Sequence, residues 1–164
     1  MNSKSLYIAY GSNLNLRQMS FRCPTAKVAG VSEINNYELL FRGGPRGSVA
    51  TVEPFKGGRV PVLLWSLQEK DLQSLDRYEG YPHLYRKEIL NVELGGKPVS
   101  AMVYVMNGGR PLGSPSDYYL DTIMEGYKSA GFDTEILTES VEKSIRLAAE
   151  QQPEQEDFFD MKWW

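Results

Sequence analysis

The chain has one cysteine, one histidine and no long uninterrupted hydrophobic run among its 164 residues. Because Cys23 has no second cysteine to pair with, no intrachain disulfide can form, which fits a reducing cytoplasm and predicts that localisation. Cys23 and His83 cannot together build a zinc site of the usual kind, so we expect no metal. Without an apolar signal core or a segment of transmembrane length, we expect no membrane span.

Charge and composition narrow the classes of partner. The formal net charge is −3 and the chain has no cluster of Lys and Arg, which argues against nucleic acid or an anionic membrane surface. Hydrophobic residues make up 41% of the chain and aromatic residues 12%, as in folded globular proteins rather than disordered ones. We therefore expect a folded domain that binds neither nucleic acid nor membrane.

Turn residues divide most of the chain into short strands. Asn35-Asn36 and Gly57-Gly58 predict turns between strands, and Gly95-Gly96 predicts the turn of a hairpin. The expected strands after the first apolar run cover residues 26–34, 37–42, 49–54, 60–67, 85–94 and 97–106. Hairpins and one strand-helix unit coexist, so we expect the α+β class, as a small partial β-barrel of mixed strands flanked by helices.

Capping residues and apolar spacing predict four helices. Asn15, or the Ser12-Asn13 pair, caps a short first helix that packs through Leu16, Met19 and Phe21. The second helix covers residues 68–79, and the third begins after Ser116 and ends at Gly131. The fourth covers residues 134–151, and one face carries Leu137, Val141, Ile145 and Ala148.

The domain is expected to span residues 1–152, followed by an acidic-aromatic tail at 153–164 that ends in Trp163-Trp164. Aromatic area of this size is expected to be buried against a surface. Two alternatives are open: the tail packs on its own domain, which we favour, or it packs on the partner subunit of a homodimer.

The first apolar run ends at Gly11-Ser12-Asn13, where the chain changes from strand to helix. A glycine at a strand end allows a tight turn, and the three backbone amides can then point at one spot. This pattern predicts an anion-binding concavity, with the Asn13 side-chain amide able both to donate and to accept. The alternative is an ordinary turn between a strand and a helix.

Glu79 shares the apolar face of the second expected helix with Leu72 and Leu75. Gly80 ends the helix immediately after it, so the carboxylate lies at the negative end of the helix dipole. Burial and the nearby charge of Asp76 act in the same direction, and all three influences raise the pKa of Glu79. A carboxylic acid adjusted toward neutral pH suits proton transfer.

Other side chains leave competing interpretations open. Glu79 could instead reach solvent, or form an ion pair with one of three basic residues, Arg77, Arg86 and Lys87. Tyr85 and Tyr119 are candidate pocket residues with hydroxyl groups, although tyrosines are usually core residues. We expect His83 to be a surface loop residue and Cys23 a small core or turn residue.

Taken together, these segments resemble the gamma-glutamylcyclotransferase-like family, which includes the plant proteins called avirulence-induced gene 2-like. The strand-ending loop and the Glu79-Gly80 segment at this separation form a specific combination, whereas either alone is a weak signal. The matching pieces are Tyr10-Gly11-Ser12-Asn13-Leu14, Gly47-Ser48-Val49-Ala50-Thr51-Val52, Leu75-Asp76-x-x-Glu79-Gly80, Tyr85-Arg86 and Pro115-Ser116-x-x-Tyr119.

The resemblance implies a mixed barrel with a cavity over the Tyr10–Leu14 loop. It also implies that the α-amine of a gamma-glutamyl amino acid or amine attacks its own gamma-carbonyl, giving 5-oxoproline and a released amine without a cofactor. Glu79 would act first as general base and then as general acid. Tyr10, Gly11, Ser12, Asn13 and Leu14 would bind the substrate together with Tyr85 and Tyr119.

Two other function classes compete with the cyclotransferase. A non-catalytic small-molecule binder or interaction module is compatible with the same fold, because fold does not fix function. Hydrolysis, or transfer to an external acceptor, would need a nucleophile or a water-activating base. Ser12 is well placed for such a role, but no second histidine supports it.

Overall fold

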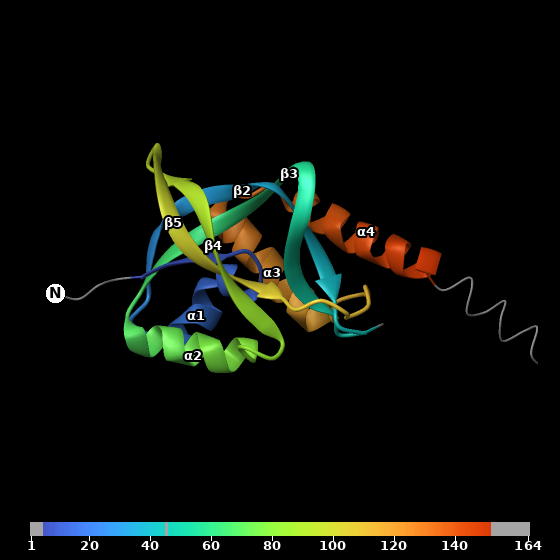
Figure 1. Ribbon diagram of the computed structural model, residues 1–164, viewed down its shortest axis with the longest axis horizontal. Coiled ribbons are helices and arrows are strands. Elements are labelled where there is room, and N and C mark those ends of the chain that lie inside the picture. Colours follow the sequence, from blue (N-terminus) through green and yellow to red (C-terminus); the bar gives the residue numbers. More distant parts are fainter. Residues whose placement is uncertain (1–4, 45, 152–164) are drawn as a thin grey trace, which may run out of the picture.

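A five-stranded mixed sheet forms the centre of the molecule, with the strand order β2-β3-β1-β5-β4 (Figure 1). The computed structural model describes residues 5–44 and 46–151. The strands are β1 (Ser5–Ala9), β2 (Lys27–Arg42), β3 (Val49–Leu67), β4 (Tyr85–Leu94) and β5 (Lys97–Met106). β1 pairs antiparallel with β3 and parallel with β5, so it occupies the central position that its apolar run predicts.

The open sheet curls until its two edge strands approach each other. A Cβ atom added at Gly30 of β2 would lie 2.7 Å from Cδ1 of Leu94 on β4, so these strands leave little space between them. The same two strands line one groove, with Ser32 and Glu33 on one side and Asn91 and Glu93 on the other. The predicted α+β partial barrel with mixed strands is therefore confirmed.

The breaks predicted within the first hairpin are wrong. Residues 27–42 form one long strand, β2, and residues 49–67 form its antiparallel partner, β3. The pairing shifts register between Asn35 and Tyr37, and the Gly57 amide donates to Oδ1 of Asn36 at 3.1 Å. The two groups of turn residues thus face each other across the hairpin and form a bulge that bends it without reversing the chain.

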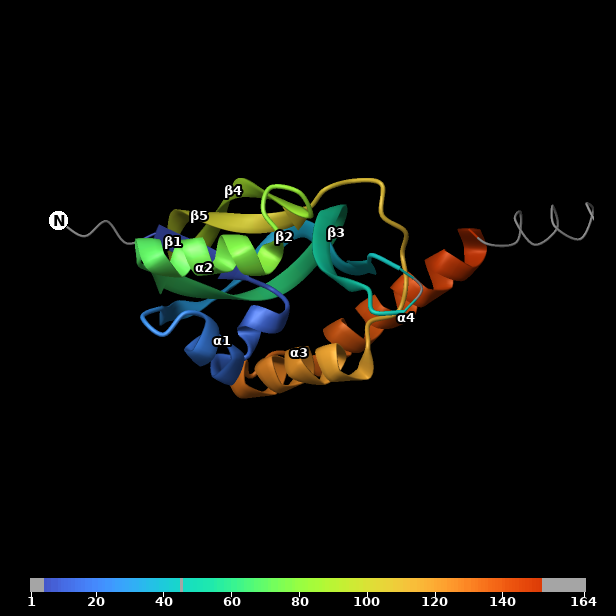
Figure 2. The same cartoon turned by 90° about the horizontal axis from the view of Figure 1, so that it is seen from below.

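In the residues that the structure describes, four α-helices and one 3₁₀ turn pack around the sheet. They are η1 (Ser12–Leu14), α1 (Leu16–Arg22), α2 (Glu69–Glu79), α3 (Asp117–Ala130) and α4 (Thr134–Gln151). Figure 2 shows α1, α3 and α4 on one side of the sheet. The predicted caps are confirmed, because Asn15 accepts from the Gln18 amide at 3.0 Å and Ser116 accepts from the Tyr119 amide at 3.2 Å. Gly131 ends α3 with a left-handed φ of 76°.

The helix faces differ from the predicted ones at two positions. Phe21 is 78% exposed, and Met19 is the fully buried side chain of α1. On α4, Ile145 is 45% exposed, whereas Ser144 is buried and accepts a hydrogen bond from the Phe41 amide at 3.0 Å. The face that α4 turns toward β2 is therefore partly small and polar, which apolar periodicity does not detect.

The core lies between the sheet and the helices. Its fully buried side chains include Ile8, Leu64, Ile123 and Leu137, and Cys23 is 2% exposed, as expected of a small core residue. Within residues 5–44 and 46–151, no helix has the length and apolar character needed to cross a membrane. The predicted tail at 153–164 lies outside the described residues.

Candidate active site

The turn after β1 leaves three consecutive backbone amides without acceptors. η1 is closed by the Leu14 amide, which donates to the Gly11 carbonyl at 3.0 Å, and by the Asn15 amide, which donates to the Ser12 carbonyl at 3.1 Å. The N–H groups of Gly11, Ser12 and Asn13 donate to no other described residue. Neighbouring N–H groups of this kind favour an anion, as the sequence pattern predicts.

The absence of a side chain at Gly11 leaves space at this turn. Its φ is −124°, outside the left-handed region that favours glycine. A Cβ atom at this position would lie 3.2 Å from the Ala50 Cβ and 3.5 Å from the Tyr119 hydroxyl. The missing side chain therefore lets the loop approach the wall formed by β3 and α3.

A cavity of about 240 Å³ lies beside this loop. It brings together all but one of the residues predicted for the site, from the turn after β1 and from η1, α2, β4 and α3. The lining residues are Tyr7, Tyr10, Gly11, Ser12, Asn13, Val49, Ala50, Tyr78, Glu79, Leu84, Tyr85, Tyr104 and Tyr119. Leu14 is not among them, because its side chain is fully buried against α3, next to Gly126.

Glu79 reaches the cavity from the last turn of α2. Gly80 ends the helix in the left-handed conformation, with φ 64°, so the predicted helix end is confirmed. Burial raises the pKa of the Glu79 carboxyl to about 7, and the positive charge of Arg22 acts in the opposite direction. At neutral pH the group is therefore divided between acid and carboxylate, the state that suits a proton shuttle.

The basic residues considered as partners of Glu79 are engaged elsewhere or form no ion pair with it. Arg86 pairs with Glu88 at 2.7 Å, and Lys87 pairs with Asp76 at 3.0 Å. Within the described chain Glu79 forms no ion pair at 4.0 Å or less. The carboxyl is thus left free for a ligand in the cavity.

Asp76 does not act on Glu79 as predicted. Its carboxylate accepts a hydrogen bond from the Tyr104 hydroxyl at 2.5 Å and from Nζ of Lys87 at 3.1 Å. These partners offset its charge, and Asp76 is not among the causes of the raised pKa of Glu79. Burial supplies the shift that the sequence analysis attributed partly to a like charge.

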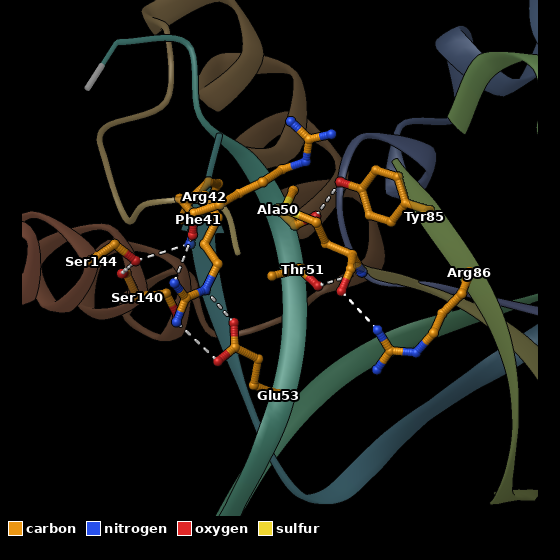
Figure 3. A network of polar contacts seen from close by, with 11 residues as sticks. Phe41, Arg42, Ala50, Thr51, Glu53, Tyr85, Arg86, Ser140 and Ser144 are labelled. Atoms are coloured by element: carbon orange, nitrogen blue, oxygen red, sulfur yellow. Dashed lines mark hydrogen bonds and ion pairs between the residues drawn. The ribbon is translucent and has the colours of Figure 1, made fainter. Parts of the chain in front are cut away.

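Two predicted pocket tyrosines hold the backbone of Ala50. The Tyr85 hydroxyl donates to the Ala50 carbonyl at 2.6 Å, and the Ala50 amide donates to the Tyr119 hydroxyl at 3.1 Å. Figure 3 shows β3 between Tyr85 of β4, which reaches Ala50, and Arg42 of β2, which pairs with Glu53. Oγ1 of Thr51 accepts from the Met106 amide of β5 at 3.0 Å. The two tyrosines therefore hold the cavity wall at the carbonyl and at the amide of Ala50.

Four residues close to the site escaped the sequence analysis. Tyr7, Tyr78 and Tyr104 line the cavity, and Arg22 places its guanidinium 3.5 Å from the centre of the Tyr78 ring. Strand alternation could have put Tyr7 on the same face of β1 as Ala9. No sequence signal links α1 to the end of α2, so the position of Arg22 depends on tertiary packing.

The comparison with protein families addresses the resemblance directly. The family model described as "Gamma-glutamyl cyclotransferase, AIG2-like" matches residues 7–126. The chain belongs to this gamma-glutamyl cyclotransferase family. The family prediction is therefore confirmed, and the matched segment includes the η1 loop, Glu79, Tyr85 and Tyr119.

Individual relatives agree with the assignment to the gamma-glutamyl cyclotransferase family. A bovine protein named gamma-glutamylcyclotransferase is 30% identical over 140 residues, which cover 79% of this chain and 73% of the relative. The human protein of that name is 28% identical over 141 residues, with the same coverage. A solved structure named gamma-glutamyl cyclotransferase superimposes with a TM-score of 0.73 at 27% identity, covering 84% of this chain and 86% of the other.

The single histidine and the single cysteine lie outside the lining of the cavity. His83 is exposed in the turn after α2, as predicted, and is not among the cavity residues. Cys23 is buried, with its thiol 3.5 Å from the Asp71 carbonyl. Over the part of the chain that the structure describes, no three side chains of His, Cys, Asp or Glu are grouped to hold a metal.

The raised pKa of Glu79 predicts a pH-dependent cost to folding. Between pH 4.5 and about 7, the folded protein keeps a proton that the unfolded chain has lost, so stability falls as pH rises through this range. We expect Glu79→Gln to melt at a higher temperature than the wild type at pH 8. The difference should vanish below pH 4.5, because Glu79 is then protonated in both the folded and the unfolded state. At higher pH, each unit of difference between the two pKa values corresponds to ~1.4 kcal/mol.

Thermal melts of both proteins from pH 4 to pH 8 measure this effect. Glu69→Gln, at the exposed first position of the same helix, is the matched control and should show no comparable pH trend. A melting difference for Glu79→Gln that stays constant across the range would contradict a raised pKa.

Proposed function

We propose that the chain is a gamma-glutamyl cyclotransferase that converts a gamma-glutamyl amino acid or gamma-glutamyl amine to 5-oxoproline and releases the amino acid or amine. The observation that carries the proposal is the half-buried Glu79 carboxyl in one cavity with the N–H groups of Gly11, Ser12 and Asn13. An acid-base group and a set of anion-binding donors are the two elements that this chemistry requires.

The reaction is an intramolecular acyl transfer. The substrate's α-amine nitrogen forms a bond to its gamma-carbonyl carbon, which closes a five-membered lactam ring. The bond from that carbon to the leaving nitrogen then breaks. Glu79 takes the proton that the attacking amine loses and gives it to the leaving nitrogen, so the step balances without an oxidant or a second substrate.

The cavity also restricts the substrate's conformation. Ring closure requires the glutamyl chain to fold so that its amine meets its own carbonyl, and holding that conformer removes an entropic part of the barrier. The free amides of η1 suit two roles, binding of the α-carboxylate or of the oxyanion that develops at the gamma-carbonyl. Tyr85 and Tyr119 lie on the lining and offer hydroxyl groups to the substrate.

Further parts of the proposal concern cofactor and compartment. The balanced step uses only the substrate and the side chains named above, so we propose that turnover needs no cofactor. We place the reaction in the cytoplasm, in keeping with a chain that has a single cysteine. Both a monomer and a homodimer are compatible with the cavity, whose named residues come from one chain.

Product analysis tests the proposal. The purified full chain is incubated with a panel of gamma-glutamyl amino acids and gamma-glutamyl amines, and 5-oxoproline is followed by mass spectrometry. We expect 5-oxoproline and the released amine in equal amounts from at least one panel member. Binding seen by thermal shift, with no product from any panel member, would instead favour a non-catalytic binder.

A further inference from the structure

The guanidinium of Arg22 fixes which way the Asn13 side chain faces. Nη1 of Arg22 donates to Oδ1 of Asn13, and Nη2 donates to Oε1 of Gln18 at 2.9 Å. Arginine has donors and no acceptor, so the atom of Asn13 that faces it must be the oxygen. The amide nitrogen of Asn13 therefore has to point the other way.

The hydrogen bond from Asn13 to Tyr7 fixes the role of the Tyr7 hydroxyl oxygen as an acceptor. Nδ2 of Asn13 donates to the Tyr7 hydroxyl oxygen at 2.9 Å, at a site where Tyr7 is 3% exposed. Since the oxygen accepts this bond, the hydroxyl proton of Tyr7 is left to donate elsewhere. No described residue accepts it, and Tyr7 lines the cavity.

Three other tyrosines of the cavity donate their hydroxyl protons to acceptors within the protein. Tyr10 donates to the Tyr104 carbonyl at 2.7 Å, Tyr85 donates to the Ala50 carbonyl at 2.6 Å, and Tyr104 donates to Asp76 at 2.5 Å. A ligand in the cavity can therefore use these hydroxyls only as acceptors. Tyr7 and Tyr119 differ from them, because the Tyr7 hydroxyl accepts from Asn13 and the Tyr119 hydroxyl accepts from the Ala50 amide. Of these two, Tyr7 is the one whose orientation is fixed by a charged residue, through Asn13 and Arg22.

We propose that Arg22 and Asn13 direct the Tyr7 hydroxyl proton toward a negatively charged oxygen of the bound gamma-glutamyl group. Tyr7 is then a substrate-contacting hydrogen-bond donor, and Arg22 is a positioning residue that acts through Asn13. The inference rests on the proposed function, because it assumes that a gamma-glutamyl group occupies the cavity.

Ionisation of the surrounding groups is compatible with this role. Burial, followed by the nearby Glu79, raises the pKa of Tyr7 well above its usual value, so the hydroxyl keeps its proton at physiological pH. The groups that face Glu79 from β1, the turn after β1, β4, β5 and α3 are tyrosines with raised pKa values, and Arg22 from α1 supplies the positive charge. Loss of Arg22 should therefore change the pKa of Glu79 and move the pH profile, whereas loss of the un-ionised Tyr7 hydroxyl should not.

Steady-state kinetics of single and double variants test the chain of bonds. Tyr7→Phe removes the donor and keeps the ring, and we expect kcat/KM to fall about 10²-fold, as for loss of one oxyanion donor. Asn13→Asp keeps the acceptor for Arg22 but turns the second bond around, because the Tyr7 hydroxyl would then donate to the new carboxylate. The kcat/KM of Asn13→Asp should fall at least as far as that of Tyr7→Phe. The double variant should have a kcat/KM only slightly lower than that of Asn13→Asp alone.

Arg22 is tested by a pH profile and by a conservative variant. Arg22→Met should lower kcat/KM about tenfold and move its acidic limb to higher pH, because the positive charge near Glu79 is lost. Arg22→Lys keeps the positive charge, so the acidic limb of its profile should lie close to that of the wild type. Tyr7→Phe should leave the limb where it is, since the Tyr7 hydroxyl does not ionise in this range.

Tyr127→Phe is the matched control for Tyr7→Phe. Tyr127 is fully buried in α3, its hydroxyl has no hydrogen-bond partner among the described residues, and it is not part of the cavity lining. It should retain wild-type kcat/KM. An active wild type with an unimpaired Tyr7→Phe, or with fully additive losses in the double variant, would overturn this inference alone. A wild type that forms no 5-oxoproline would overturn it together with the proposed function.

Discussion

Glu79→Gln is expected to lower kcat by about 10³-fold or more while leaving the fold intact, in the upper half of the range for general acid-base residues. The amide is close in size and shape to the carboxyl, so the packing at the end of α2 should be preserved. It cannot accept the proton of the attacking amine or return one to the leaving nitrogen. Because one group serves both transfers, both halves of the reaction lose their catalyst.

The kinetic assay should be paired with measurements of fold and binding. Circular dichroism should match the wild type, and substrate should still stabilise the variant in a thermal shift, because the η1 amides and the cavity tyrosines remain. Glu69→Gln lies on the same helix, away from the cavity, and should keep full activity. Near-normal turnover by Glu79→Gln would mean that another group carries the proton.

Gly126→Ala is expected to damage stability and activity together. Gly126 lies in α3, where a Cβ atom would meet the Cβ of Leu14 at 2.7 Å, its carbonyl carbon at 2.8 Å and its carbonyl oxygen at 2.9 Å. Two of these atoms are backbone, so η1 itself has to move. Asn13 precedes Leu14 directly, and the displacement therefore reaches the cavity.

Two opposing effects set the size of the stability change. Alanine gains ~1 kcal/mol over glycine in a helix interior, whereas overpacking a well-packed core costs about 1–3 kcal/mol, and contact with backbone favours the upper end. We expect a net loss of about 1–2 kcal/mol, seen as a melting temperature several degrees lower. We also expect kcat/KM to fall roughly tenfold, since misplaced positioning groups slow oriented reactions.

Gly108→Ala is the matched control for Gly126→Ala. Gly108 is exposed, and a Cβ atom there would meet nothing within 4 Å. Both its melting temperature and its kcat/KM should equal those of the wild type. If Gly126→Ala melted at or above the wild-type temperature with full activity, the contact between α3 and η1 would not position the loop.

Local patterns predicted the elements whose signals lie close together in the sequence. The hairpin of β4 (Tyr85–Leu94) and β5 (Lys97–Met106) and the helix α4 (Thr134–Gln151) have the predicted bounds. Glu79 was found because apolar spacing placed it on the inner face of α2 and Gly80 marked the helix end. Such signals depend on the periodicity and on the capping chemistry of neighbouring residues.

Features that depend on tertiary contacts were not predictable in this way. The bulge opposite Asn36 forms because two distant groups of turn residues face each other in one hairpin. Asp76 lost its predicted influence on Glu79 because Lys87 and Tyr104 reach it from β4 and β5. The orientation of Asn13 depends on Arg22, nine residues later on another helix.

The reaction in water enriched in oxygen-18 is the most direct test of intramolecular cyclisation assisted by Glu79. Hydrolysis would place a solvent oxygen on the gamma-carbon, whereas attack by the substrate's own amine brings in none. We predict that the wild type forms 5-oxoproline without oxygen-18, one molecule for each amine released, and that Glu79→Gln forms it slower by about 10³-fold or more. Glutamate carrying oxygen-18 as the main product would contradict cyclisation and identify the protein as a hydrolase.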